Sequence, residues 1–171
     1  RDWYIENKSD LLKSHLIHKR IKFVDSVVFY ENIKLKILNA SHSALAYLGL
    51  LLGHKYVHEA IDDELCYNFI NNYLDREVIP TIQQQDNFDL IQYKKDVLKR
   101  FRNHFLNHKL EQIGMDGSLK LPIRIINTFK NKDENTEYVY TYIIIACWIL
   151  FLKQNNINKF NYAVSDPMFD D

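Results

Sequence analysis

The sequence predicts a single, mainly α-helical domain, and three observations carry that prediction. Apolar residues recur at helical spacing along most of the 171-residue chain. Only 4 glycines and 3 prolines are present, so few positions are suited to ending a helix. Hydrophobic residues make up 47% of the chain, which is enough for one core, and neither an internal repeat nor a long linker divides it. We therefore expect one multi-helix domain over residues 1–171.

The first half of the chain is expected to hold a mixed lead-in followed by three helices. Short β-branched and aromatic segments in the lead-in have little periodicity, whereas Ile33, Ile37 and Ala44 lie at helical spacing after it. In chain order, we predict an irregular or part-stranded segment over residues 1–30 with a helical turn near Asp10–His18, a long helix from Glu31 to Gly53, a helix after His54, and a helix from Glu64 to Val78 before Pro80.

The second half is expected to consist of helices between polar loops. Leu90, Val97 and Phe101 indicate an amphipathic helix, with lysines and arginines between them on a solvated face. In chain order, we predict a loop over Thr81–Phe88, the amphipathic helix from Leu90 to Phe105, a short helix at Leu110–Ile113 closed by Gly114 and Gly117, a helix from Leu121 to Phe129, a loop over Asn131–Asn135, a helix from Tyr138 to Leu152, and a tail with a turn at Asp166-Pro167.

Composition argues against several classes of function. The 22 basic and 22 acidic residues cancel, so the chain lacks the positive field with which duplex-binding domains collect phosphates, and we expect no nucleic-acid partner. The apolar stretch Tyr138–Leu152 is shorter than the roughly twenty residues that a membrane-spanning helix needs, so we expect no membrane partner. Cys66 and Cys147 lie in no CxxC motif, which favours reduced, buried thiols and a cytoplasmic protein.

Three polar side chains with catalytic potential lie within the predicted long helix. At about 100° per residue, Asn39 lies roughly 140° and His42 roughly 80° around the helix axis from Lys34. An amine, an amide and an imidazole that share a helix face could act on a hydroxyl or carbonyl as acid/base, hydrogen-bond donor and orienting group. The ordinary alternative is that Lys34 reaches solvent while Asn39 and His42 make structural hydrogen bonds.

Two blocks of the chain carry a family-like pattern. The first comprises Tyr30-Glu31, Lys34, Leu38-Asn39, His42 and Ala46-Tyr47-Leu48-Gly49. The second comprises Arg100-Phe101-Arg102-Asn103, His108, Gln112-Ile113, Met115-Asp116-Gly117-Ser118-Leu119-Lys120-Leu121-Pro122 and Arg124. In this order they resemble the polyol-specific long-chain dehydrogenase/reductase family, which includes mannitol dehydrogenases and D-mannonate oxidoreductases (fructuronate reductases). Weaker matches at Trp3-Tyr4-Ile5-Glu6 and Ser165-Asp166-Pro167 extend the resemblance over nearly the whole chain.

The resemblance implies a fold and a role for each of six residues. The fold would be that of the C-terminal helical domain of mannitol dehydrogenase, which is like the C-terminal domain of 6-phosphogluconate dehydrogenase. Lys34 would be the catalytic acid/base, Asn39 would donate a hydrogen bond to the substrate oxygen, and His42 would orient the substrate alcohol. The substrate-binding residues would be Lys120, Gln112 and His108. Gln112 stands where mannitol dehydrogenases have arginine and mannonate-type members have glutamine, which favours a sugar-acid substrate over mannitol.

The resemblance also implies a nicotinamide cofactor, NAD or NADP, for the interconversion of a secondary alcohol and a ketone of a polyol or sugar acid. In the family, the cofactor binds an N-terminal Rossmann domain with a glycine-rich turn after its first strand. This sequence has no GxGxxG motif. We therefore expect that the Rossmann domain is absent from this chain, that it is a partner within the same protein, and that the chain alone is inactive. One departure from the family is Asn103-His104, where Asn-Pro is usual.

Two other interpretations are left open. His54 and His58 lie four residues apart, as do His104 and His108, and such pairs on a helix face can chelate zinc. Because no HExxH motif is present and the family reaction needs no metal, we expect no metal in this chain. The alternative to an enzyme is a diverged, non-catalytic helical module that binds a partner or a small ligand.

Overall fold

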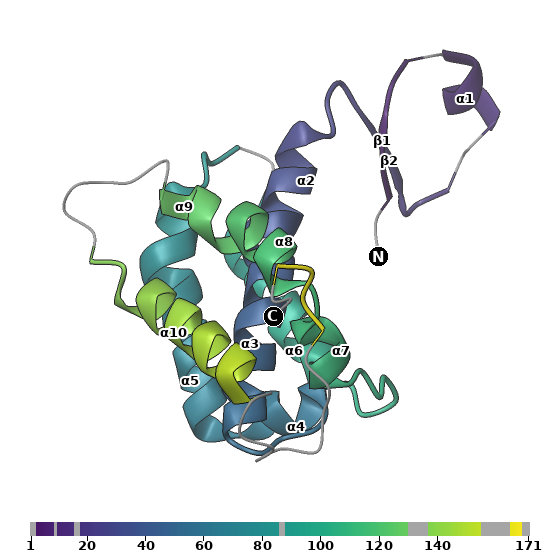
Figure 1. Cartoon of the computed structure of the whole chain (residues 1–171). Helices are drawn as coiled ribbons and strands as arrows, with labels where there is room; N and C mark the ends of the chain where they lie inside the picture. The colour runs from purple at the N-terminus through teal and green to yellow at the C-terminus, as the bar shows by residue number, and fades with distance from the viewer. Residues whose placement is uncertain are drawn as a thin grey trace.

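The computed structural model describes residues 3–8, 10–15, 18–85, 88–129, 137–154 and 165–168. A body of packed helices carries a small lead-in that projects from one end (Figure 1). The prediction of a mainly α-helical domain is confirmed. The predicted loop Asn131–Asn135 and most of the tail lie outside the described residues.

The lead-in is a small β-α-β unit. Strands β1 (Trp3–Glu6) and β2 (Ile21–Val24) pair in parallel. Two parallel strands need a crossover connection, and helix α1 (Asp10–His15) lies within it. The ring of Tyr4 stacks on that of Tyr30 with centroids 3.7 Å apart, which joins the lead-in to the helical body. The part-stranded lead-in with a helical turn is therefore confirmed.

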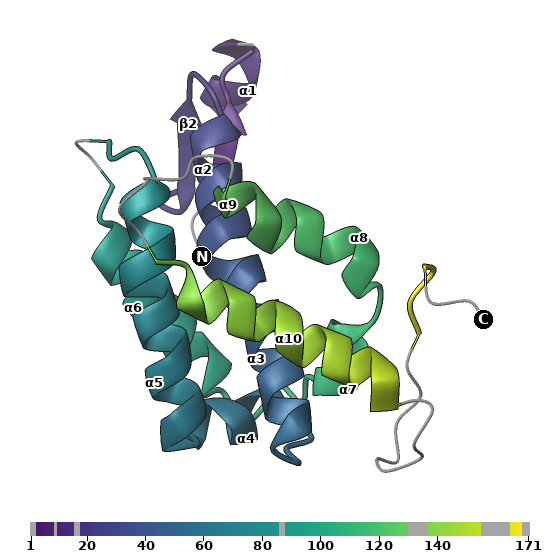
Figure 2. The same cartoon turned by 60° about the vertical axis from the view of Figure 1, so that its left-hand side comes forward.

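One continuous helical rod runs through the middle of the body. It consists of α2 (Val28–Ile33), the π-helix η1 (Lys34–Asn39) and α3 (Ala40–Leu51). The prediction of a long helix is confirmed, but its α-helical period is wrong over η1, where hydrogen bonds join residues five apart. Most of α3 is buried, because other helices cover it on several sides (Figure 2).

The remaining helices pack around this rod, with α7 and α10 against α3. A Cβ atom at Gly49 of α3 would lie 2.8 Å from Leu110 Cδ1 and 2.9 Å from Ala60 Cβ, so glycine permits this close packing. The elements are α4 (Val57–Asp62), α5 (Glu64–Tyr73), the π-helix η2 (Leu74–Val78), the 3-10 helix η3 (Ile79–Thr81), α6 (Leu90–Phe101), α7 (Leu110–Gly114), α8 (Gly117–Leu121), the π-helix η4 (Pro122–Ile126), α9 (Asn127–Phe129) and α10 (Val139–Gln154).

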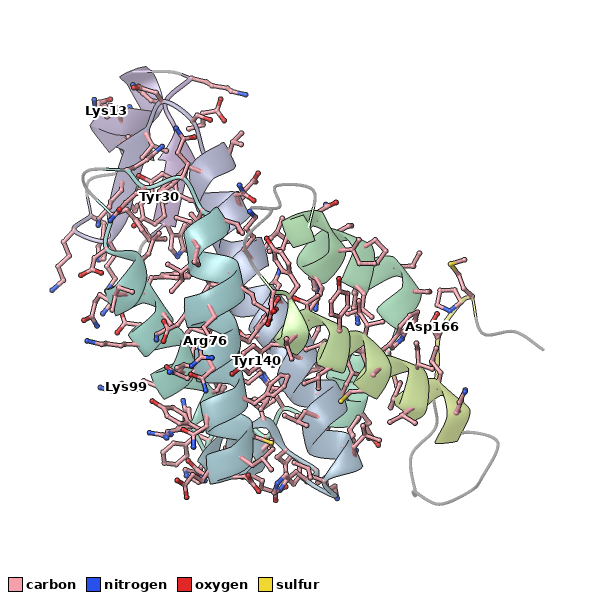
Figure 3. The ribbon with its side chains drawn as sticks, turned by 90° about the vertical axis from the view of Figure 1, so that its left-hand side faces the viewer. Lys13, Tyr30, Arg76, Lys99, Tyr140 and Asp166 are labelled. Atoms are coloured by element: carbon pink, nitrogen blue, oxygen red, sulfur yellow. The ribbon has the colours of Figure 1, made fainter. Side chains whose placement is uncertain are left out.

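A buried carboxylate fixes the start of α10. Glu77 is fully buried and accepts hydrogen bonds from the backbone N–H groups of Tyr140 (2.6 Å) and Thr141 (2.8 Å). The Thr141 hydroxyl donates to the same carboxylate at 2.6 Å. Figure 3 shows Tyr140 beside η2, the segment that contains Glu77. No helix in the described part of the chain is long and apolar enough to cross a membrane.

Three details of the predicted elements are wrong. Helix α6 ends at Phe101 and leaves Phe105 exposed, because the Asn103 carboxamide accepts the Phe105 N–H at 3.0 Å and forms a turn. Gly117 begins α8 instead of closing a helix, and it must be glycine because a Cβ there would clash with the Trp148 ring. Lys94 does not lie on a solvated face: it is buried and its Nζ lies 2.7 Å from an Asp75 oxygen. Both cysteines are buried and free, as expected.

Candidate active site

Lys34 and Asn39 begin and end the π-helix η1. Because a π-helix joins residues five apart, these two residues lie about one turn from each other. The angle between them around the helix axis is therefore smaller than the roughly 140° that an α-helix would give. Lys34 is exposed and Asn39 is half-buried. Short π segments are rare and occur often at functional sites. Here η1 packs against α6 and against a second π segment, η4.

His42 follows on α3 and is half-buried. Its ring stacks on that of Phe101 with centroids 5.1 Å apart, and the His108 ring lies at 6.2 Å. Burial, followed by the charges of His108, Arg124 and Lys120, lowers the pKa of His42 to about 4. The imidazole is therefore neutral at pH 7. Its Nε2 is buried and has no hydrogen-bond partner among the described residues.

His108 is positioned by the start of α4. The Val57 N–H donates to the carbonyl of His108 at 3.0 Å, and the Leu110 N–H donates to the carbonyl of Lys55 at 2.9 Å. Tyr56 and Lys109 form an antiparallel bridge between these contacts. The non-helical segment between α6 and α7 is thus anchored where it passes close to His42.

Two cations approach His42 from α8 and η4. The Lys120 ammonium donates to the Met115 carbonyl at 2.5 Å. The Arg124 guanidinium donates to the hydroxyl of Ser43, the neighbour of His42, at 2.9 Å. Helix α8 continues directly into η4, so the four-residue spacing of Lys120 and Arg124 places both side chains on the same side of this continuous helix. Arg124 belongs to the second block of the family-like pattern, where no role was assigned to it, although its four-residue spacing from Lys120 was a usable signal.

The structure brings only some of the predicted residues together. His42, His108 and Lys120 form one cluster with Phe101 and Arg124, which we call the His42 cluster. Phe101 was not predicted as a site residue, because an aromatic residue at helical spacing indicates a core position. Lys34 and Asn39 belong to the same rod as His42, whereas Gln112 lies exposed on α7. Within the described residues, no hydrogen bond or ion pair involves the side chains of Lys34, Asn39 or Gln112.

The histidine pairs of the alternative zinc interpretation do not share helix faces. His54 precedes α4 whereas His58 lies within it, and both His104 and His108 lie in the non-helical segment after α6. The i,i+4 interpretation is therefore wrong. Instead, the rings of His58 and His104 lie 4.6 Å apart, and His54 pairs with Asp63.

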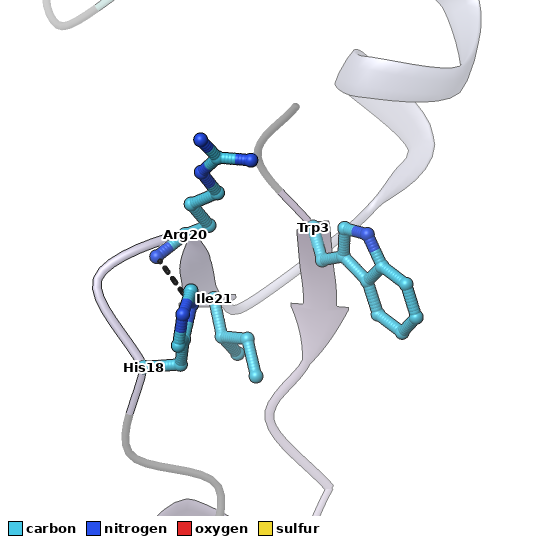
Figure 4. Close-up of a pocket in the computed structure, with 4 residues that line it drawn as sticks. All are labelled: Trp3, His18, Arg20 and Ile21. Atoms are coloured by element: carbon cyan, nitrogen blue, oxygen red, sulfur yellow. Dashed lines mark hydrogen bonds between the residues drawn. The ribbon is translucent and has the colours of Figure 1, made fainter.

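Two surface hollows lie away from the His42 cluster. The first, about 330 Å³, is lined by Trp3, His18, Arg20 and Ile21 of the lead-in, where the Arg20 N–H donates to His18 Nδ1 (Figure 4). The second, about 600 Å³, lies between the lead-in, α2 and the residues around Gln83. Neither hollow includes a residue of the His42 cluster, so the cluster does not line either of them.

Residues 26–171 match the family described as the mannitol dehydrogenase C-terminal domain. The chain belongs to this family. The match covers both blocks that carry the resemblance, and it confirms the assignment made from them. It also accounts for the mainly α-helical fold of the described residues.

Other members of the mannitol dehydrogenase family resemble this chain over almost its full length. The chain is 30% identical to the D-arabinitol 4-dehydrogenase of Klebsiella pneumoniae over 98% of its residues, and to the D-mannonate oxidoreductase of Escherichia coli (strain K12) over the same share. It covers 37% and 35% of those proteins, respectively, and thus about a third of their length. The structure of Pseudomonas fluorescens mannitol 2-dehydrogenase, a ternary complex with NAD and D-mannitol, matches 98% of the chain with a TM-score of 0.85 and 32% identity, and the chain covers 34% of it.

Proposed function

We propose that this chain is the substrate-binding and catalytic part of an NAD(P)-dependent oxidoreductase. The reaction interconverts a secondary alcohol and a ketone on a polyol or a sugar acid. One observation carries the proposal. The helical rod holds the neutral His42 and the π-helical turn with Lys34 and Asn39, and the elements packed against the rod bring two cations, Lys120 and Arg124, close to His42. The relatives named for arabinitol, mannitol and mannonate support this reaction class.

Lys34 is proposed as the acid/base. Its amine takes the proton of the substrate hydroxyl during oxidation and returns it during reduction. The Asn39 amide donates a hydrogen bond to the same oxygen, where negative charge builds up, because a fixed donor stabilises that charge without reorganisation. The π turn that places Lys34 and Asn39 near one side of the rod supports this pairing.

His42 is proposed to orient the substrate. A neutral imidazole can both donate and accept a hydrogen bond, which suits an alcohol group. Its buried Nε2 lacks a partner among the described residues, so a substrate hydroxyl would satisfy an otherwise unpaired group. Lys120, Gln112 and His108 are proposed to bind the rest of the substrate. The cationic charge of Lys120 and Arg124 next to His42 supports a sugar acid, whose carboxylate it would attract.

The cofactor is proposed to bind outside this chain. NAD(P) would supply hydride exchange, but the residues here do not fit its phosphates. The described residues contain two strand-to-helix connections, β1 to α1 and β2 to α2, and neither contains a glycine. A dinucleotide phosphate site needs glycines at such a turn so that backbone N–H groups can approach the ligand. An N-terminal Rossmann domain of the same protein is the proposed cofactor site, and the 171-residue chain alone would be inactive.

A substrate panel tests the proposed function. The protein that carries this chain with its cofactor domain is assayed against mannonate, altronate, mannitol and arabinitol, each with NAD⁺ and NADP⁺. We expect turnover with at least one substrate and a preference for the sugar acids. Absence of turnover with all four substrates would favour the non-catalytic module instead.

The substrate-binding role of Gln112 gives a second test. Gln112→Ala should raise KM for the preferred substrate about fivefold with little change in kcat, because one hydrogen bond contributes roughly 1 kcal/mol to binding. Gln112 is exposed and makes no hydrogen bond within the described residues, so the fold should be unaffected. Gln84→Ala, at another exposed glutamine, is the control. An unchanged KM in Gln112→Ala would remove this residue from the site.

A further inference from the structure

Three donor atoms of different kinds meet at the end of α3 opposite to the His42 cluster. They belong to His54, Asp63 and Cys66, and all lie within 4.8 Å of one another. His54 follows α3, Asp63 is the N-cap of α5, and Cys66 lies in the first turn of α5. The twelve residues of α3 separate this group from the start of α3 by about 18 Å. The group therefore lies apart from the residues of the proposed reaction.

The distances suit a tetrahedral metal ion. His54 Nε2 and Asp63 Oδ2 lie 3.2 Å apart, and zinc ligands at about 2.0–2.1 Å from a tetrahedral ion are separated by roughly 3.3 Å. A thiolate at about 2.3 Å from the ion would lie roughly 3.6 Å from either of them. Cys66 Sγ lies at most 4.8 Å from each of the other two donor atoms. It would therefore have to move closer by about 1 Å at most to bind the same ion.

Backbone hydrogen bonds hold the Asp63 carboxylate in place, and one of its oxygens points toward His54. Asp63 Oδ1 accepts the N–H groups of Leu65 (2.8 Å) and Cys66 (3.2 Å), so Oδ2 alone faces His54. Fixed carboxylates of this kind are typical of metal ligands. Glu59 adds a second negative charge that acts on His54. The field around His54 therefore favours a cation.

Cys66 supplies the observation that separates this group from an ordinary helix cap. Its side chain is fully buried, and its thiol makes no hydrogen bond within the described residues. A cap formed by Asp63 and His54 does not explain why a third, buried donor points to the same place. His54 and Asp63 are partly exposed, so solvent water can reach a fourth ligand position.

We propose that His54, Asp63 and Cys66 form a binding site for a divalent metal ion of the zinc type, which ties the end of α3 to the start of α5. The expectation of a metal-free chain is revised by this proposal. On binding, the Cys66 S–H bond breaks, the sulfur forms a bond to the metal and the proton passes to solvent. Because binding releases this proton, affinity should rise with pH.

Cobalt(II) titration of the purified chain tests the site, since a thiolate bound to Co²⁺ gives a charge-transfer absorption band. We expect one Co²⁺ per chain with this band, and one Zn²⁺ that displaces it. Cys66→Ser should abolish the band, whereas Cys147→Ser, at the other buried cysteine, should leave it intact. His54→Gln should weaken binding at least tenfold, and His58→Gln is its matched control.

The outcomes are decisive because circular dichroism shows whether each variant remains helical. Cys66 is buried, so Cys66→Ser could unfold, but His54 is partly exposed and His54→Gln tests the site independently. Absence of the band in the wild-type chain, or its persistence in a folded Cys66→Ser, would overturn the proposal. Equal effects of His54→Gln and His58→Gln would also overturn it. The measurement involves no turnover and is independent of the proposed reaction.

Discussion

The residues around His42 keep its imidazole neutral, which bears on both the stability of the fold and the proposed chemistry. Phe101 covers one face of its ring, and the charges of His108, Arg124 and Lys120 oppose its protonation. A positively charged imidazole would repel the cations that are proposed to attract substrate. A neutral one can donate and accept hydrogen bonds at the same time. The surroundings thus select the protonation state that the proposed substrate-orienting role requires.

The lowered pKa of His42 predicts how stability depends on pH. The native pKa is about 4 and the unfolded value about 6.5, so between these values the unfolded chain binds more protons. Stability therefore rises with pH through this window and is lost on acidification. Between pH 7 and pH 5, His42 should reduce the free energy of unfolding by about 2 kcal/mol. Urea denaturation at both pH values measures this.

His42→Gln is the matched variant, since glutamine does not titrate. Its free energy of unfolding should fall by about 2 kcal/mol less than that of the wild type between pH 7 and pH 5. His18→Gln, in the exposed lead-in, should keep the wild-type dependence. An identical pH dependence in His42→Gln and the wild type would contradict the burial of a neutral His42.

Elements are joined by a few buried polar contacts between distant parts of the chain. Glu77 of η2 caps the first turn of α10, where unpaired N–H groups need acceptors. Arg124 ties η4 to α3, and Lys120 satisfies a carbonyl at the end of α7. These contacts hold in place the helices that surround the His42 cluster. Each is a point where one substitution should affect the whole body.

Glu77→Gln should lower the free energy of unfolding by about 1–3 kcal/mol. An amide keeps one acceptor but turns an N–H₂ group toward the donors of Tyr140 and Thr141, so a buried group is left unsatisfied. Thermal denaturation followed by circular dichroism measures the loss. Glu137→Gln, at an exposed residue just before α10, should cost less than about 1 kcal/mol. Equal losses in both variants would argue against the role of Glu77 as a cap.

At the scale of the whole molecule, periodicity was sufficient to predict the helices but not their finer geometry. Apolar spacing located α3, α5, α6 and α10 because each buries one side or more in a shared core. It could not locate η1, since the switch from a four- to a five-residue hydrogen bond leaves the apolar pattern nearly unchanged. It also extended α6 to Phe105, because a local Asn103 side-chain bond overrode the pattern.

The candidate site residues were harder to predict from periodicity than the helices were. The resemblance of the two sequence blocks implied one site for His42, His108 and Lys120, and these residues lie near one another although they belong to three separate segments. Periodicity alone could not have paired them, because tertiary packing of α8 and the segment before α7 against α3 decides their distances. The group of His54, Asp63 and Cys66 was missed for the same reason. His54 lies between α3 and α4, whereas Asp63 and Cys66 lie at the start of α5, so no spacing along a single helix joins all three.

The catalytic role of Lys34 is the central claim, and turnover of Lys34→Ala tests it most directly. The variant is made in the protein that carries this chain with its cofactor domain, and kcat is measured with the preferred substrate. We predict a loss of at least about 100-fold, typical of a removed acid/base, with an unchanged helical fold. Lys99→Ala, at an exposed lysine of α6, should keep full activity. Wild-type kcat in Lys34→Ala would contradict the account.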